Sequence, residues 1–212
     1  MIELIRFKYF LLIFLLIIIV AIISSSTIFA DQKIKITADE IITNQVDGKI
    51  KATGNVVAKD DKGSKIKSDH LTYDIDNSTI SADNNVILND IEGNTYFFDK
   101  LVSDDEITNL NGINIKARLD DGSRIVGSTL IKKESISSLQ DAEYTPCNKN
   151  NYLIENCPGW KLKAKKIFQD NENKTIYYDH ARIHLFNTPL FYLPYFSHPD
   201  PSVNKRSGLL MP

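Results

Sequence analysis

The sequence predicts an all-β protein whose antiparallel sheet is built from two-strand units of about thirty residues. An aspartate followed two places later by a large aliphatic residue returns at a constant interval, as Asp39-Glu40-Ile41, Asp69-His70-Leu71 and Asp99-Lys100-Leu101. A second line, Ala52 to Val57, matches Ala82 to Ile87 at the same interval. A unit of this size cannot bury its apolar face alone, so we expect successive units to stack.

The composition is that of an ordinary folded protein. The chain has 212 residues, of which 42% are hydrophobic and 25% are charged, and its formal net charge is -2. Because a nucleic-acid-binding protein needs an excess of positive charge, this balance gives no reason to expect nucleic acid as a partner.

Residues 1–30 have the pattern of an export signal. Arg6 and Lys8 precede an apolar run that reaches Ile23, and small and polar residues then lead to Ala30. This order predicts a signal peptide cut after Ala30, and a retained membrane anchor is the alternative because the apolar run nearly suffices to span a bilayer. In both cases the rest of the chain leaves the cytoplasm.

Residues 31–133 alternate apolar and polar side chains, the period of half-buried strands. Lys33–Ile36, Lys49–Ala52, Lys65–Ser68 and Leu71–Ile75 are examples, and Gly-, Asp- and Asn-rich turns separate them. We expect strands of about five to eight residues joined by tight turns. The sheet must then fold into a sandwich or a curved trough so that its apolar faces meet.

Residues 134–159 break the thirty-residue period and are predicted to be a loop insertion. They contain two prolines and both cysteines of the chain, Cys147 and Cys157. In an oxidising compartment the two thiols could close a disulfide-bonded loop, whereas a zinc site would need two further ligands that no nearby histidine supplies.

The sheet is predicted to resume over residues 160–188. Lys161, Lys163 and Lys165 share one face of the first strand there, either as a solvated edge that discourages aggregation or as a stripe that contacts an anion. Residues 189–212 are rich in aromatic residues and proline. The prolines argue against a continuous paired strand, and the apolar end of this segment is expected to dock on another surface.

No known catalytic motif accompanies these strands, and we expect no enzyme activity, metal or cofactor. His180 and His184 would lie about 13 Å apart on a strand, too far to share a metal ion. Asp39, Asp69 and Asp99 could form a carboxylate row that cleaves polysaccharide. Carboxylates at a constant position of a repeat more commonly cap turns or face solvent, so this enzyme remains the alternative hypothesis.

The repeated Ala-Asp-x-Ile/Leu line, together with Ala-Thr-Gly-Asn-Val-Val at 52–57, resembles the OstA-type domain of lipopolysaccharide transport proteins. This domain occurs in LptA, in LptC and at the start of LptD. The second half of the chain is similar to the LptD family in particular. The matching segments are Tyr144-Thr145-x-Cys147, Cys157-Pro158-Gly159-Trp160, Pro189 to Asp200 and Arg206 to Pro212.

This resemblance implies a periplasmic β-jelly-roll, an open trough of antiparallel strands that holds the acyl chains of lipopolysaccharide and associates with the outer membrane. It further implies edge-strand pairing with an LptA-like periplasmic bridge, and an LptE plug in a membrane barrel. The apolar residues expected to line the trough are Ile41, Val56, Leu71, Tyr73, Ile75, Val86, Leu88, Phe97 and Leu101. The alternative is that they fill the closed core of a sandwich.

Arg206 to Pro212 resembles the LptD family's entry into its barrel, and the chain departs from the family in having no barrel after this segment. Each membrane strand needs about ten residues, so we expect a fragment, a degraded gene or half of a split gene, with LptE and a barrel supplied by another chain. In the family, cysteines of this domain pair with cysteines of the barrel. A Cys147–Cys157 bond or a bond to another chain then remains, and a stand-alone LptA-like or LptC-like subunit is the alternative function.

Overall fold

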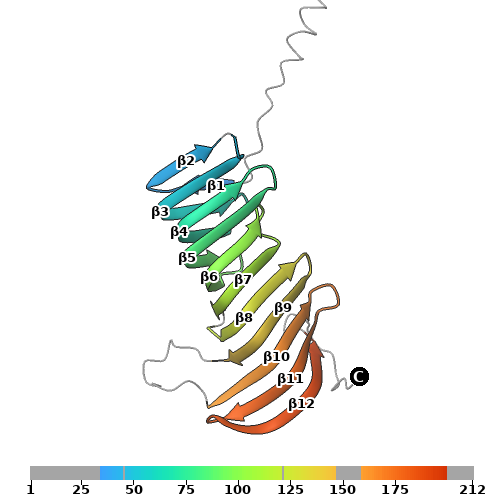
Figure 1. The fold of residues 1–212 in the computed structure, drawn as a ribbon. Coiled ribbons are helices and arrows are strands. Elements are labelled where there is room, and N and C mark those ends of the chain that lie inside the picture. Colours follow the sequence, from blue (N-terminus) through green and yellow to red (C-terminus); the bar gives the residue numbers. More distant parts are fainter. Residues whose placement is uncertain (1–33, 45, 121, 147–158, 200–212) are drawn as a thin grey trace, which may run out of the picture. The chain divides into compact units, whose positions relative to one another are not determined.

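The computed structural model describes residues 34–44, 46–120, 122–146 and 159–199, which all lie in one compact unit. They form one antiparallel sheet in which the strands follow each other in chain order, from β3 in blue to β12 in red (Figure 1). The strands are β1 (Ile34–Thr37), β2 (Glu40–Asn44), β3 (Lys49–Asp60), β4 (Lys65–Asp74), β5 (Thr79–Asn89), β6 (Thr95–Asp104), β7 (Leu110–Arg118), β8 (Arg124–Lys133), β9 (Ile136–Thr145), β10 (Trp160–Asp170), β11 (Thr175–Leu185) and β12 (Thr188–Pro199). The prediction of an all-β antiparallel fold is confirmed. Among the described residues, no helix has the length and apolar character needed to cross a membrane.

Most strands are longer than predicted because each one continues through a bend near its middle. β4 runs from Lys65 to Asp74 and so contains two segments that the sequence predicted as separate strands. Its pairing with β5 shifts register between Lys67 and His70. In β3 the bend falls at Gly54 and Asn55, which both have positive φ, +75° and +46°. A change to left-handed backbone turns a strand sharply without ending it.

The repeated aspartate lies at these bends and accepts a hydrogen bond from an asparagine of the second strand of the same unit. Asn55 Nδ2 donates a hydrogen bond to Asp39 Oδ2 at 2.8 Å, and Asn85 Nδ2 donates one to Asp69 Oδ2 at 2.7 Å. Asn114 Nδ2 does the same to Asp99 Oδ2 at 2.6 Å. All three asparagines have positive φ, which asparagine tolerates better than most residues. The thirty-residue repeat therefore records the positions of the bends.

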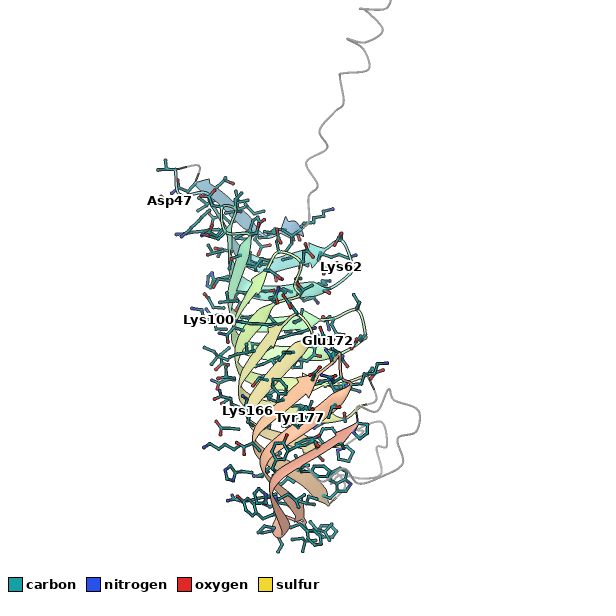
Figure 2. The ribbon with its side chains drawn as sticks, turned by 90° about the vertical axis from the view of Figure 1, so that its right-hand side faces the viewer. Asp47, Lys62, Lys100, Lys166, Glu172 and Tyr177 are labelled. Atoms are coloured by element: carbon teal, nitrogen blue, oxygen red, sulfur yellow. The ribbon has the colours of Figure 1, made fainter. Side chains whose placement is uncertain are left out.

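The bends fold the sheet into two layers, each made of one half of every strand. In β3 and β4, the first layer contains the halves between the bends and the β3–β4 turn, Val56–Asp60 and Lys65–Ser68. The second layer contains Lys49–Thr53 and His70–Asp74, which pair in the same way. In Figure 2, Lys100 at the bend of β6 lies on one side of the sheet, and the turn residues Lys62 and Glu172 lie on the other. We call the side of the sheet that carries Lys62 and Glu172 the open side.

Apolar side chains from both layers pack into one core between them. Its buried members are Ile34, Ala52, Val56, Ala58, Ile66, Leu71, Ile80, Ala82, Val86, Leu88, Phe98, Leu101, Ile107, Leu110, Ile115, Ala117, Leu139 and Ala142. A smaller cluster of Ala164, Tyr178 and Ala181 continues the core through β10 and β11. Each large aliphatic side chain in such a core contributes about 1.5–3 kcal/mol to folding.

Two predictions about the second half of the chain are wrong. Residues 136–145, placed in a loop insertion, form β9, which pairs with β8 and β10 and buries Leu139 and Ala142. Residues 188–199, judged unable to form a continuous paired strand, form β12. Among the described strands, β12 pairs with β11 alone. Its prolines lack an N–H donor, but they therefore break no hydrogen bond to a second neighbouring strand.

The bend contact predicts a position-specific loss of stability. Asn85→Ala removes the bond to Asp69 and puts alanine, which tolerates left-handed backbone less well than asparagine, at φ +54°, so we expect the free energy of unfolding to fall by about 1–2 kcal/mol. Asn85→Gly keeps the backbone conformation accessible and should cost less. Urea denaturation measures both variants. The matched control is Asn111→Ala, an exposed asparagine of β7 away from the bends, expected to change stability by less than about 0.5 kcal/mol.

Candidate functional site

The interior between the two layers contains most of the apolar residues predicted to line a trough. Five of them are buried in the main core, with exposed fractions of 3% or less. Tyr73 is half-buried and packs against the same cluster. The five buried residues are Val56, Leu71, Val86, Leu88 and Leu101.

Ile41 and Ile75 lie at the margins of this interior. Ile41 pairs with Ala52, so its side chain is on the same face of the sheet as that buried alanine. It is nevertheless 47% exposed, because β2 is an end strand that, among the described strands, pairs with β3 alone. Ile75 lies in the turn after β4 and is 46% exposed.

Phe97 does not join the interior. Its neighbours Tyr96 and Phe98 both pack inward, so Phe97 lies on the outer face of the first layer with 44% exposure. Inward residues alternate on each side of a bend. Across the bend they are three apart in β6, as Phe98 and Leu101 show, and four apart in β5, as Ala82 and Val86 show. An uninterrupted alternation counted back from Leu101 would put Phe97 on the inner face, but the bend between Phe98 and Leu101 puts it on the outer face, so the expectation that Phe97 lines the interior is corrected.

The same bend rule identifies interior residues that the sequence prediction missed. Ile66 and Ile80 are among the most deeply buried large side chains, with exposed fractions of 0% and 1%. Each lies on the alternation of its own strand half, Ile66 with Ser68 before the bend and Ile80 with Ala82 before the next. Counting back from Leu71 through the three-residue step of the bend reaches Ile66, and counting back from Ala82 of the second repeated line reaches Ile80.

The repeated aspartates are structural ligands of the bends. Asp39, Asp69 and Asp99 are exposed, and each accepts a hydrogen bond from its own asparagine. No group of three metal-ligating side chains occurs in the part of the chain that the structure describes. These contacts do not favour the polysaccharide-cleaving alternative.

The predicted lysine stripe is partly neutralised by Glu143 of β9. Lys161 and Lys163 approach its carboxylate at 3.3 and 3.0 Å. Burial raises the pKa of Glu143, but the two ammonium groups outweigh this effect and hold its pKa below the ordinary value. β10 lies between β9 and β11, so the interpretation of these lysines as an edge strand is wrong.

The outer face of the last strands is aromatic as well as basic. Phe168, Tyr177 and Tyr195 lie side by side on β10, β11 and β12, with ring centroids 5.9 and 6.3 Å apart. Lys166 Nζ lies 5.8 Å from the centroid of the Phe168 ring, and these side chains line a shallow depression. Figure 2 labels Lys166 and Tyr177 on this part of the sheet. The interior and this outer face are separate surfaces.

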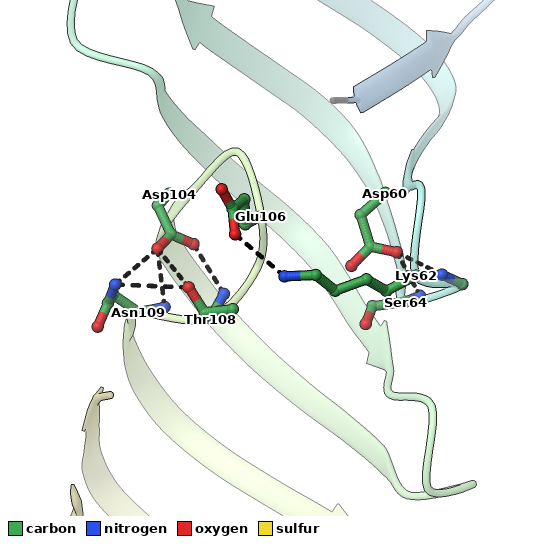
Figure 3. Close-up of polar contacts among 8 residues, drawn as sticks. Asp60, Lys62, Ser64, Asp104, Glu106, Thr108 and Asn109 are labelled. Atoms are coloured by element: carbon green, nitrogen blue, oxygen red, sulfur yellow. Dashed lines mark hydrogen bonds and ion pairs between the residues drawn. The ribbon is translucent and has the colours of Figure 1, made fainter. Parts of the chain in front are cut away.

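Two turns face each other across the open side of the sheet. In the β3–β4 turn, Asp60 Oδ1 accepts hydrogen bonds from the backbone N–H groups of Gly63 and Ser64 at 2.6 and 2.7 Å. This capping holds the turn that carries Lys62. Lys62 Nζ then donates to Glu106 Oε2 of the β6–β7 turn at 3.0 Å (Figure 3). The hydrogen bond raises the pKa of Lys62.

Ile107 lies beside Glu106 and points into the core. It is 6% exposed and belongs to the cluster that contains residues of both layers. Its φ is +54°, a conformation that costs a β-branched residue about 1–2 kcal/mol. The β6–β7 turn is capped by Asp104, which accepts from Thr108 N and Thr108 Oγ1 at 2.7 Å and from Asn109 N at 3.1 Å. The buried side chain and the cap together stabilise this strained turn.

Comparison with known proteins gives sequence relatives in one group. The chain is 36% identical over 74 residues to the LPS-assembly protein LptD of Idiomarina loihiensis, an alignment that covers 35% of the chain and 9% of that protein. It is 30% identical over 86 residues to LptD of Aliivibrio fischeri, covering 41% of the chain and 10% of that protein. No family model matches.

The chain is similar to LptD. The resemblance predicted from the repeat and the second half of the sequence is thereby confirmed. The matched region spans about a tenth of the length of these LptD relatives. Among solved structures, LptH, the LptA-homologous periplasmic component of the lipopolysaccharide transport device from Pseudomonas aeruginosa, is 14% identical with a TM-score of 0.40. That match covers 46% of the chain and 73% of LptH. The signal segment 1–30, Cys147, Cys157 and residues 200–212 lie outside the described residues.

The cap of the β6–β7 turn predicts acid sensitivity. Burial raises the pKa of Asp104, but the hydrogen bonds from Thr108 and Asn109 outweigh burial and lower its pKa below the ordinary value. A carboxyl whose folded pKa lies below its unfolded pKa of about 3.9 stabilises the fold above that pH. This stabilisation is lost as the pH falls through the folded pKa.

We therefore expect the wild-type chain to lose more of its unfolding free energy between pH 5 and pH 3 than Asp104→Asn loses. Denaturant titrations at several pH values measure the two slopes. Asp83→Asn, which removes one exposed carboxylate from β5, controls for the change in net charge. Equal slopes in wild type and Asp104→Asn would contradict the assignment.

Proposed function

We propose that this chain takes part in lipopolysaccharide transport by holding acyl chains between the two layers of its bent sheet. The observation that carries the proposal is the continuous apolar core shared by both layers, in a chain that is similar to LptD. The process needs no bond to be made or broken. Sheltering hydrocarbon from water contributes about 25 cal/mol for each Å² of apolar surface that is removed.

The residues proposed to contact acyl chains are those that the bends bring to the interior. Val56, Leu71 and Tyr73 lie in adjacent strands, and Val86, Leu88 and Leu101 continue the row. Ile41 and Ile75 would meet a chain at the margins of the interior. Phe97, on the outer face, would not meet it, so the proposed lining differs from the predicted lining at this position.

The proposal includes a place and partners for the chain. Residues 1–30 would direct export, and the exported part would act in the periplasm at the outer membrane. A Cys147–Cys157 disulfide would suit that oxidising compartment. Within the part of the sheet that the structure describes, the end strands β1 and β2 pair with β3 alone, and a strand of an LptA-like bridge could add to this edge by backbone hydrogen bonding.

Photocrosslinking from two aromatic positions tests the proposal. Tyr73 and Phe97 are each replaced by p-benzoylphenylalanine in cells that make lipopolysaccharide. Tyr73 packs on the core and Phe97 lies on the outer face, so both variants carry the same probe on opposite faces. We expect about tenfold more lipopolysaccharide adduct at position 73, the ratio that a preference of about 1.4 kcal/mol for the interior produces.

The substitution also removes the Tyr73 hydroxyl, which donates to Asp105 Oδ2 at 3.4 Å. Tyr73→Phe, measured for thermal stability and for lipopolysaccharide capture by an affinity tag, controls for that loss. Equal adduct yields from positions 73 and 97 in folded protein would sink the proposal.

A further inference from the structure

The β6–β7 turn, Asp105 to Asn109, reaches over the open side of the interior. Ile107 at its tip is buried in the core that both layers share. The turn is anchored to the second layer on both sides, since Asp105 N donates to Ser78 O at 3.1 Å and Asn109 Oδ1 accepts from Glu134 N at 2.8 Å. Its tip is thus held between neighbouring turns while its side chain fills interior space.

The corresponding turn one unit earlier behaves differently. Ile75, which follows Asp74 in the β4–β5 turn, is 46% exposed, whereas Ile107 is 6% exposed. The β4–β5 turn has four residues, 75–78, and the β6–β7 turn has five, 105–109. The added residue, with the left-handed conformation of Ile107, lets an aliphatic side chain turn inward.

The β6–β7 turn is also joined to the opposite layer. Lys62 Nζ and Glu106 Oε2 are 3.0 Å apart and come from turns at the ends of different layers (Figure 3). Both side chains are close to half exposed, at 48% and 41%. An ion pair with this exposure is weak and salt-sensitive, so it can break and re-form without unfolding the sheet.

We propose that Asp105–Asn109 is a strap that closes the interior on its open side, with Ile107 occupying the place that an acyl chain takes when the strap is displaced. Strained backbone conformations of this kind are found at switch segments, where the surrounding contacts hold them. The inference rests on the proposed function, because the strap regulates access to that same interior. An acyl chain that replaces Ile107 leaves the core filled and frees the turn from its strained conformation.

A covalent lock tests whether the strap must move. Lys62→Cys/Glu106→Cys, with Cys147 and Cys157 changed to Ser, is joined by a short bis-maleimide so that the turns of the two layers cannot separate. The control lock is Ser135→Cys/Glu172→Cys in the same background. Its two turns belong to the same layer and are already in contact, with Ser135 Oγ 3.1 Å from Glu172 Oε1. Each protein is incubated with purified lipopolysaccharide, and adduct from p-benzoylphenylalanine at position 73 is measured.

We expect the lock across the layers to reduce adduct formation about tenfold or more, and the control lock to leave it unchanged. Capture by both locked proteins at the level of the unlocked protein would overturn the strap and leave the proposed function standing. Absence of adduct in the unlocked wild-type background would overturn the proposed function, and the strap with it.

A charge exchange tests the strap without a crosslinker. Lys62→Glu places two carboxylates across the opening, and we expect capture to become about two- to fivefold faster, the factor expected for loss of an exposed ion pair. Lys62→Glu/Glu106→Lys restores opposite charges and should restore the wild-type rate. Thermal melting verifies that each variant is folded. If the exchanged pair captures lipopolysaccharide as fast as Lys62→Glu, the ion pair does not hold the strap.

Discussion

The two-layered fold depends on the bend in each strand, where the backbone becomes left-handed without ending the ladder. Three contacts of 2.6–2.8 Å, each between an aspartate and an asparagine 15 or 16 residues later, stabilise the bends of β3 to β7. Because a single strand supplies both layers, the two layers cannot slide past each other on the side of the bends. On the open side none of the described strands runs from one layer to the other, so closure there depends on contacts between turns.

Much of this fold could be predicted from the sequence, because the bend residues are polar, exposed and repeated. Asp69 and Leu71 revealed the unit length, and alternation revealed the strands. The bend itself could not be recognised from the sequence. In β6 the inward positions step from Phe98 to Leu101, but an alternation counted from Phe97 also arrives at Leu101 and so looks uninterrupted. Val56, Leu71 and Val86 lie close to the repeated motifs and are buried in the interior, while their contact with lipid stays a prediction. Ile107 could not be found from periodicity, since its inward direction comes from a left-handed turn.

The ends of the sheet show the same difference between local pattern and tertiary context. Pro189, Pro194 and Pro199 argue locally against a strand, yet β12 is an end strand that pairs with β11 alone among the described residues. Only knowledge of which strand is last could have reversed that argument. β12 has apolar side chains on both faces, as β6 does. Leu193 packs inward, while Tyr192, on the opposite face of the strand, is 49% exposed.

A core that is already filled appears at first to conflict with a role in holding lipid. Val56, Leu71 and Leu101 are at most 2% exposed, so an acyl chain gains little unless it replaces contacts that the protein makes with itself. The most replaceable contacts are those of a side chain on a short turn, because moving a turn leaves the ladders of both layers intact. Ile107 is such a side chain, and its replacement by hydrocarbon exchanges one apolar contact for another. The tight packing and the proposed transport role are compatible for this reason, since the interior can remain dry while its occupant changes.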